Sequence, residues 1–258
     1  MCYSDSARPP LPPIRGGSTD HQDLTLTAAD GNRFMAYAAR AAQPTGAGMV
    51  IMPDVRGLHT FYKELARRFA EAGIDAVAID YFGRTAGLGS RDETFEHMPH
   101  VEKTTRDGIA ADVAAAVSFL RSAEGGRVRA VFTVGFCFGG ANSWAQSAAG
   151  HGLAGVIGFY GRPSRVRDLI PQMQTPLLLL LAGADRATPQ DEFERFDREL
   201  TDAGVEHAMV VYPGAPHSFF DRTAAEHQDA ARDAWGQILA FVDRETRAKS
   251  QPAETTRA

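Results

Sequence analysis

The stretch Gly135-Phe136-Cys137-Phe138-Gly139-Gly140 decides how this chain is interpreted. It joins the apolar segment 129–135, which predicts a buried strand, to the segment 139–149, which is compatible with a helix. A sharp turn between a strand and a helix strains the backbone at its apex and leaves no room for side chains on either side, which explains the glycines. The turn also directs the sulfur of Cys137 toward the helix N-terminus, where partial positive charge and free N–H groups favour a thiolate and an oxyanion. The stretch therefore predicts a nucleophilic cysteine.

An interior cysteine is more often a small buried apolar side chain than a nucleophile, so the assignment depends on its partners. In the nucleophile elbow, the turn that carries a catalytic nucleophile, an acid follows a later strand and a histidine follows a still later one. Asp185 comes after the apolar segment 176–182, and His217 follows the segment 207–212. Taken singly, Asp185 could be an ordinary turn residue and His217 an ordinary loop histidine. Their order and spacing together favour a catalytic set of cysteine, aspartate and histidine.

The rest of the chain alternates between short apolar runs and segments with helical periodicity. Such alternation predicts an α/β fold with a mainly parallel central sheet and helices on both faces. The alternating patterns at 23–27 and 33–39, separated by the turn Asp30-Gly31-Asn32, predict an N-terminal antiparallel hairpin. The predicted parallel strands are 49–53, 75–80, 129–135, 153–160, 176–182 and 207–212. The predicted helices are 60–72, 101–122, 139–149, 190–203 and 224–243.

The two ends of the chain differ in composition from its middle. Residues 1–20 contain four prolines and little apolar surface, which predicts a flexible N-terminal tail. Residues 244–258 lose the apolar periodicity, which predicts a polar C-terminal tail. One catalytic domain is therefore expected over residues 21–243, and no internal repeat or linker divides it.

Composition and charge exclude several classes of protein. The net charge of −5, from 27 basic and 32 acidic residues, argues against a nucleic-acid partner. No apolar run approaches the roughly 20 residues of a membrane span, and the N-terminus lacks the apolar stretch of a secretory signal, so a cytoplasmic location is expected. The two cysteines, Cys2 and Cys137, are too few for a disulfide framework, and Cys2 is expected to be an incidental thiol in the N-terminal tail.

Two weaker signals are interpreted as structural. Glu93, Glu96, His97 and His100 could suggest metal ligands, but Pro99 is expected to interrupt the helix that would bring the two histidines together. A polar loop is the favoured interpretation, and no metal is expected. The glycines at 83, 87 and 89 lack the residues that accompany a phosphate-binding or dinucleotide-binding loop. No organic cofactor is expected either.

The chain resembles the dienelactone hydrolases, a family with the α/β-hydrolase fold, over roughly residues 21–243. The motifs that carry the resemblance are 135–140, Gly183-Ala184-Asp185 and 214–219, with weaker support from 53–57, 78–81 and 158–161. The resemblance implies that Cys137 is the nucleophile, His217 the base and Asp185 the acid that orients the base. It also implies that the backbone N–H groups of Val55 and Phe138 form the oxyanion hole.

The chain departs from the family pattern at two places. Where the family has a glutamate that contacts the resting thiol, this chain has Asp54, which is shorter and leaves open a direct, a water-mediated or no contact with Cys137. The family also uses arginines to hold a substrate carboxylate. Arg222 is one position away from the expected site, and Arg84 and Arg91 lie in an earlier loop, so these three are the candidate substrate-binding residues. For Arg84 and Arg91 a solvated loop side chain is the favoured interpretation.

The expected function is hydrolysis of a small ester or lactone through a thioester acyl-enzyme, as in a carboxymethylenebutenolidase. Two alternatives stay open. The same three residues could serve an acyltransferase, or the fold could be a non-catalytic domain that binds a small ligand. The natural substrate and the oligomeric state do not follow from the sequence.

Overall fold

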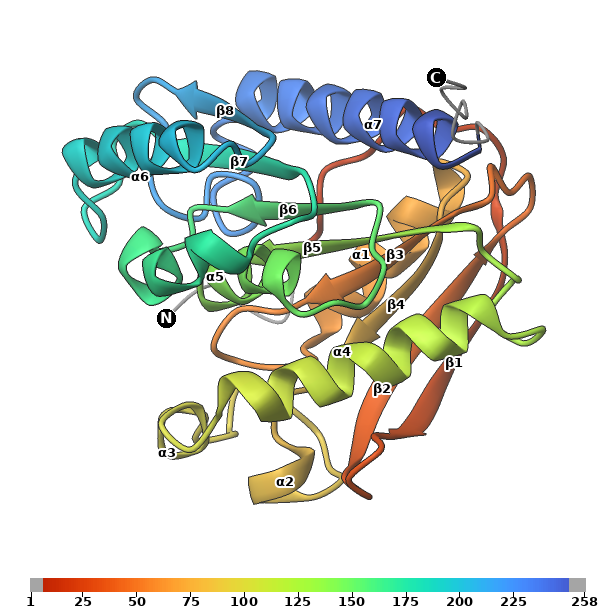
Figure 1. Ribbon diagram of the computed structural model, residues 1–258. Helices are drawn as coiled ribbons and strands as arrows, with labels where there is room; N and C mark the ends of the chain where they lie inside the picture. The colour runs from red at the N-terminus through yellow and green to blue at the C-terminus, as the bar shows by residue number, and fades with distance from the viewer. Residues whose placement is uncertain (1–6, 251–258) are drawn as a thin grey trace, which may run out of the picture.

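A computed structural model describes residues 7–250 of the chain and shows one eight-stranded sheet with helices on both faces (Figure 1). The strand order is β1-β2-β4-β3-β5-β6-β7-β8, and every pair from β4 to β8 is parallel. The predicted hairpin is present as the antiparallel pair β1–β2, and β2 also pairs antiparallel with β4. The strands are β1 Ser18–Thr27, β2 Arg33–Ala41, β3 Ala47–Met52, β4 Asp75–Ile79, β5 Ala130–Phe136, β6 Gly155–Phe159, β7 Leu177–Ala182 and β8 His207–Tyr212.

The helices form two layers. Buried side chains of α1 and α7 pack on one face of the sheet, and those of α4, α5 and α6 pack on the other, so that α4 lies in front of the strands in Figure 1. The α-helices are α1 Thr60–Glu71, α2 Gly83–Ala86, α3 Met98–Val101, α4 Arg106–Arg121, α5 Phe138–Ala145, α6 Gln190–Asp202 and α7 Gln228–Ser250. Short 3₁₀ turns occur at η1 Gln146–Ala148, η2 Pro163–Arg165 and η3 Arg167–Gln172.

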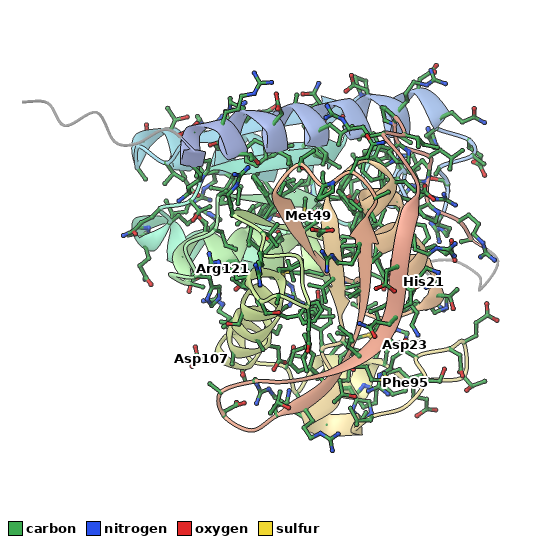
Figure 2. The ribbon with its side chains drawn as sticks, turned by 90° about the vertical axis from the view of Figure 1, so that its right-hand side faces the viewer. His21, Asp23, Met49, Phe95, Asp107 and Arg121 are labelled. Carbon is green, nitrogen blue, oxygen red and sulfur yellow. The ribbon has the colours of Figure 1, made fainter. Side chains whose placement is uncertain are left out.

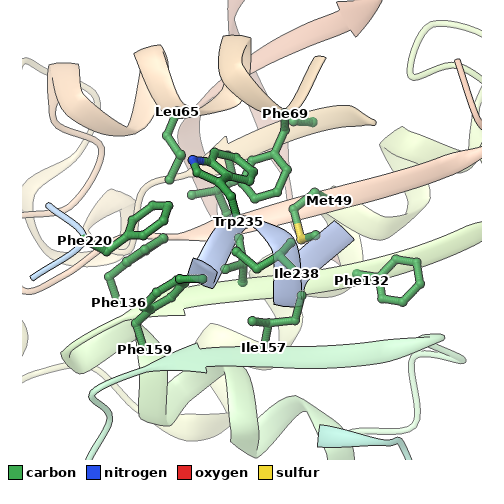
Figure 3. Close-up of a cluster of buried hydrophobic side chains, with 14 of the residues drawn as sticks. Met49, Leu65, Phe69, Phe132, Phe136, Ile157, Phe159, Phe220, Trp235 and Ile238 are labelled. Carbon is green, nitrogen blue, oxygen red and sulfur yellow. The ribbon is translucent and has the colours of Figure 1, made fainter. Parts of the chain in front are cut away.

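Aromatic rings fill the layer between the sheet and the helices α1 and α7. Trp235 of α7 lies between Phe69 of α1, at 4.8 Å between ring centroids, and Phe220, at 5.6 Å (Figure 3). Phe136, at the end of β5, stacks on Phe159, at the end of β6, with centroids 4.8 Å apart. Because these rings are fully buried, they fix the ends of β5 and β6 firmly relative to each other.

The burial of the strands agrees with the apolar patterns from which they are predicted. All residues of β3, β4, β5, β6 and β7 are buried, as expected for strands covered on both faces. The outer strand β1 is instead partly exposed, and Figure 2 shows His21 and Asp23 along this edge. Polar side chains on an edge strand discourage pairing with another chain.

The predicted C-terminal boundary of the domain, residue 243, falls inside a helix, because α7 continues to Ser250. Apolar periodicity ends where burial ends, whereas a helix can continue on polar contacts. Glu245 is still buried, and Arg247 pairs with Asp243 one turn earlier at 2.8 Å. The N-terminal boundary also differs, since β1 begins at Ser18 and Pro9 and Pro12 are buried. Cys2 lies outside the described residues.

The helix predicted over 101–122 begins later than expected, as α4 at Arg106, and residue 101 is instead the last residue of the short helix α3. Thr105 has extended backbone, and its side chain accepts a hydrogen bond from the N–H of Gly108, so it caps the N-terminus of α4. Pro99 does not interrupt a helix as expected but stands in the first turn of α3, where no backbone N–H is needed. None of the helices formed by residues 7–250 has the length and apolarity that a membrane crossing requires.

Candidate active site

Cys137 is the single residue between β5 and α5, and its backbone is strained. Its φ of 56° and ψ of −111° lie outside the conformations that side-chain-bearing residues ordinarily adopt. The flanking glycines are required by space. A Cβ on Gly135 would lie 1.9 Å from the carbonyl oxygen of Gly139, and a Cβ on Gly139 would lie 2.1 Å from that of Met52. The turn therefore has the geometry that its glycines predict.

Asp185 and His217 come together beside this turn. Asp185 follows β7, His217 follows β8, and the Oδ2 of Asp185 lies 2.7 Å from the Nδ1 of His217. The Asp185 carboxylate is buried, whereas the imidazole is 26% exposed. The other oxygen of Asp185 accepts a hydrogen bond from the N–H of Ala187 at 2.7 Å, which fixes the carboxylate. All three elements end at the same edge of the sheet because β5, β7 and β8 are parallel.

The charge on His217 is set by its neighbours. Burial alone lowers the pKa of the imidazole, but the hydrogen bonds to Asp185 and to the Cys137 thiol, together with the negative charges on both groups, outweigh burial and raise this pKa to about 10. His217 is therefore an imidazolium at neutral pH.

Cys137 and His217 line one cavity of about 200 Å³. The other residues that line it are Val55, Phe138, Tyr160, Arg162, Arg165 and Ala187. The ring of Tyr160 packs on the imidazole of His217 with centroids 4.8 Å apart. A cavity of this size accommodates a small molecule or one end of a larger one.

The two residues expected to form the oxyanion hole, Val55 and Phe138, both border this cavity. Val55 follows β3, and Phe138 is the first residue of α5. Within the described residues, neither of these backbone N–H groups donates a hydrogen bond in a turn or loop. These two donors are thus available to an oxygen beside the sulfur of Cys137.

Asp54, expected to modulate the nucleophile, is buried just before Val55. Its Oδ1 accepts a hydrogen bond from the N–H of Arg56 at 2.9 Å, and its own N–H donates to the Tyr62 hydroxyl at 3.0 Å. Its negative charge helps to raise the pKa values of Tyr160 and Asp221, so it lies close to both. Asp54 therefore lies near two buried residues, one of which, Tyr160, lines the cavity.

The three candidate substrate-binding arginines are absent from the residues that line the cavity. Arg84 pairs with Asp30 and with the buried Asp112, the latter at 2.9 Å. Arg91 is buried and binds the carboxylate of Asp80 at 2.9 Å. Arg222 is an exposed residue whose backbone N–H donates to Asp221. Arg84 and Arg91 therefore have structural partners, and none of the three faces Cys137 in the cavity.

Two arginines that the sequence does not single out lie at the cavity instead. Arg162 and Arg165 lie on the segment after β6, and both line the cavity with Cys137. The guanidinium of Arg165 lies 5.4 Å from the centre of the Phe138 ring. Neither arginine belongs to a motif of the sequence, although their position just past a parallel strand is the signal that could have found them.

No grouping of three or more His, Cys, Asp or Glu side chains able to hold a metal ion occurs between residues 7 and 250. The residues at 93–100 have other contacts. The Nδ1 of His100 lies 2.9 Å from the Thr85 hydroxyl, and its ring stacks on Phe95 at 5.2 Å.

Residues 34–246 match the model of the Dienelactone hydrolase family. A protein of Escherichia coli (strain K12) described as "Putative carboxymethylenebutenolidase" is 27% identical over 233 residues, covering 84% of each chain. The crystal structure of a "Putative Dienelactone Hydrolase" from Klebsiella pneumoniae is 26% identical, with a TM-score of 0.74 over 87% of this chain and 99% of that one. A bacterial brefeldin A esterase shares the fold at 17% identity, with a TM-score of 0.67 over 92% of this chain and 80% of that one.

Proposed function

The chain belongs to the dienelactone hydrolase family and has the α/β-hydrolase fold, and we propose that it hydrolyses small carboxylic esters or lactones with Cys137 as the nucleophile. The observation that carries this proposal is the convergence of Cys137 and His217 on one cavity, with Asp185 bound to the far side of the imidazole at 2.7 Å. An activated nucleophile requires a base within reach and a third group that orients the base.

The reaction proceeds in two halves. The Cys137 thiolate attacks the carbonyl carbon, and the oxyanion is held by the N–H groups of Val55 and Phe138. The carbon–oxygen bond to the alcohol then breaks, and the His217 imidazolium gives its proton to the departing oxygen. A thioester on Cys137 and a neutral imidazole remain.

Water completes the cycle. The neutral imidazole of His217 takes a proton from a water molecule, which attacks the thioester carbonyl. The carbon–sulfur bond breaks, and the carboxylic acid, the thiolate and the imidazolium are formed. The Asp185 carboxylate accepts a hydrogen bond from the Nδ1 side of the imidazole, so that the Nε2 side serves the reaction.

A comparison of Asp185 with a second aspartate–histidine pair tests this assignment. Cys137→Ala should lower kcat for an activated aryl acetate by about 10³-fold or more, and Asp185→Asn by about 10²-fold or more, because each removes part of one catalytic unit. Asp197 lies 3.0 Å from the Nε2 of His207 and serves as the matched control. Asp197→Asn should leave kcat unchanged. Hydrolysis by Cys137→Ala at the parental rate would overturn the proposal, and product analysis with an added alcohol separates hydrolysis from acyl transfer.

Two arginines at the cavity bear on the choice of substrate. Arg162 and Arg165 place two positive charges beside Cys137, so we propose that the acyl group carries a carboxylate. Arg162→Gln and Arg165→Gln should each raise KM for a half-ester of a dicarboxylic acid by about tenfold, the usual worth of a charge-assisted hydrogen bond, while neutral acetates are unaffected. Arg167, which pairs with Glu199, is the matched control. An equal effect on acidic and neutral esters would count against this role.

A further inference from the structure

Asp221 is a buried acid close to the candidate site, and the proposed reaction gives it no role. It lies four residues after His217 on the loop between β8 and α7, and it is 3% exposed. Its Oδ2 accepts a hydrogen bond from the Tyr160 hydroxyl at 2.9 Å, and its Oδ1 accepts one from the N–H of Arg222. The Ser218 hydroxyl also donates to this carboxylate. One carboxylate thus gathers three donors from two parts of the chain.

Two of these donors belong to residues that flank the catalytic imidazole. Ser218 directly follows His217, and Tyr160 packs its ring on the imidazole. Both residues have positive φ values, 66° for Ser218 and 36° for Tyr160, which side-chain-bearing residues seldom adopt. Such conformations persist only where surrounding contacts hold them. Asp221 supplies contacts to both.

We propose that Asp221 is a positioning residue, whose ionised carboxylate holds Tyr160 and Ser218 around the imidazole of His217 and thereby sets the imidazole against the thiol of Cys137. An ionised carboxylate binds three donors at once, and hydrogen bonds to a charged acceptor are about twice as strong as neutral ones. A proton on either oxygen occupies an acceptor site and removes this charge. The protonated form therefore holds the two residues less firmly.

The groups around Asp221 bring the loss of its proton close to neutral pH. Burial and the nearby charge of Asp54 raise the pKa of Asp221, while the donors from Arg222, Tyr160 and Ser218 lower it, and the resulting pKa is about 7. The groups that face it are thus Asp54 from the loop after β3, Tyr160 from the end of β6, and Ser218 and Arg222 from its own loop. The proposal rests on the proposed function, because the positioned imidazole is the one that activates Cys137.

The test is the pH profile of kcat/KM for an activated ester in three variants. The parent should gain activity as pH rises through about 7, when Asp221 loses its proton. Asp221→Asn should lower kcat about tenfold at pH 8, change KM less than twofold, and lose this rise. Tyr160→Phe keeps the ring but removes a donor that lowers the pKa of Asp221, so the rise should move to higher pH. Asp54→Asn removes a charge that raises this pKa, so the rise should move to lower pH.

Matched controls distinguish positioning from general loss of structure. Asp233 accepts a hydrogen bond from the Tyr212 hydroxyl at 2.9 Å, the same pair of groups at the same distance but away from the cavity lining. Asp233→Asn should leave the profile unchanged. A profile of Asp221→Asn that keeps the parental rise, or shifts of Tyr160→Phe and Asp54→Asn in the same direction, would overturn the proposal.

Alkylation of Cys137 by iodoacetamide gives a readout that needs no ester substrate. The rate for Asp221→Asn should be below the parental rate at pH 8 and should converge with it below pH 6, where Asp221 of the parent is protonated. A loop that is merely loosened would react more slowly at every pH, and this outcome contradicts the proposal. If alkylation behaves as expected but no ester is hydrolysed, the proposed function fails while the positioning role of Asp221 stands.

Discussion

At the scale of the residue, the charge of His217 connects the fold to the chemistry. The imidazole keeps its proton because Asp185 and Cys137, from two other strand ends, offset the cost of its burial. The pKa of about 10 in the folded chain compares with 6.5 for a histidine in an unfolded chain. The folded chain therefore binds the proton more tightly, and this contributes stability that is complete below pH 6.5 and is lost as pH rises through about 10.

This linkage predicts how stability depends on pH. Between pH 6.5 and pH 10 the free energy of unfolding of the parent should fall relative to that of His217→Gln, by on the order of 1–3 kcal/mol after allowance for solvent screening. Urea unfolding of both chains at several pH values measures the difference. His207→Gln, which alters the pair with Asp197 away from the cavity, is the comparison variant. A parallel course for the parent and His217→Gln would show that the imidazole is neutral in the folded chain.

At the scale of the element, two arginines attach the segment between β4 and α4 to the body of the fold. Arg91 crosses to Asp80, just after β4, and Arg84 joins the β1–β2 turn to Asp112 of α4. Burial raises the pKa of Asp112 to about 6 in spite of its hydrogen bonds to Asn32 and Arg84. Because both arginines have structural partners, we expect them to act on stability rather than on substrate binding.

The two arginines should differ in their effect on stability. Arg91→Ala leaves the buried carboxylate of Asp80 without its partner and should cost about 3–5 kcal/mol. Arg84→Ala should cost about 1–3 kcal/mol, because the side chain of Arg84 is 29% exposed and water can partly replace it. Chemical denaturation followed by circular dichroism gives both values. Neither change should alter KM for an acidic ester, and a rise in KM comparable to that of Arg162→Gln would restore the substrate-binding assignment.

At the scale of the whole molecule, the first described residues lie against the last helix. The indole N–H of Trp235, in α7, donates to the carbonyl of Pro10 at 3.0 Å, and the N–H of Arg15 donates to the carbonyl of Glu71 at the end of α1. The N-terminal segment from Ala7 therefore closes over the aromatic layer shown in Figure 3. The proline-rich segment that is expected to be a flexible tail is therefore packed against the fold from Ala7 onward.

Trp235→Phe tests this closure. The substitution keeps a buried ring but leaves the Pro10 carbonyl without its donor, so the free energy of unfolding should fall by about 1 kcal/mol or more, which is about 2–4 °C in melting temperature for a domain of this size. Differential scanning calorimetry measures the shift. An unchanged melting temperature would mean that the N-terminal segment adds nothing to the stability of α7.

The parts of the molecule that the sequence predicts correctly are those with a local cause. Buried parallel strands are continuous apolar runs, and the glycines around Cys137 follow from the space in one turn. The sequence does not predict the positions of Arg162, Arg165 and Asp221 at the site, because these positions depend on how separate loops converge. The spacing of apolar residues along the chain does not show which loops meet. The end of α7 is missed for a different reason. Its last turns are polar, so apolar spacing alone does not distinguish them from an unstructured tail.

The order of the strands along the chain has a consequence for biosynthesis. Cys137 lies near the middle of the sequence, whereas His217, which holds the positive charge beside it, follows β8, the last strand of the sheet. A chain still emerging from the ribosome therefore carries an unactivated thiol at this turn, because domains are completed only as their late segments arrive. If Cys137 is the nucleophile as proposed, its sulfur should gain the neighbouring imidazole only after nearly all of the polypeptide has been made and folded.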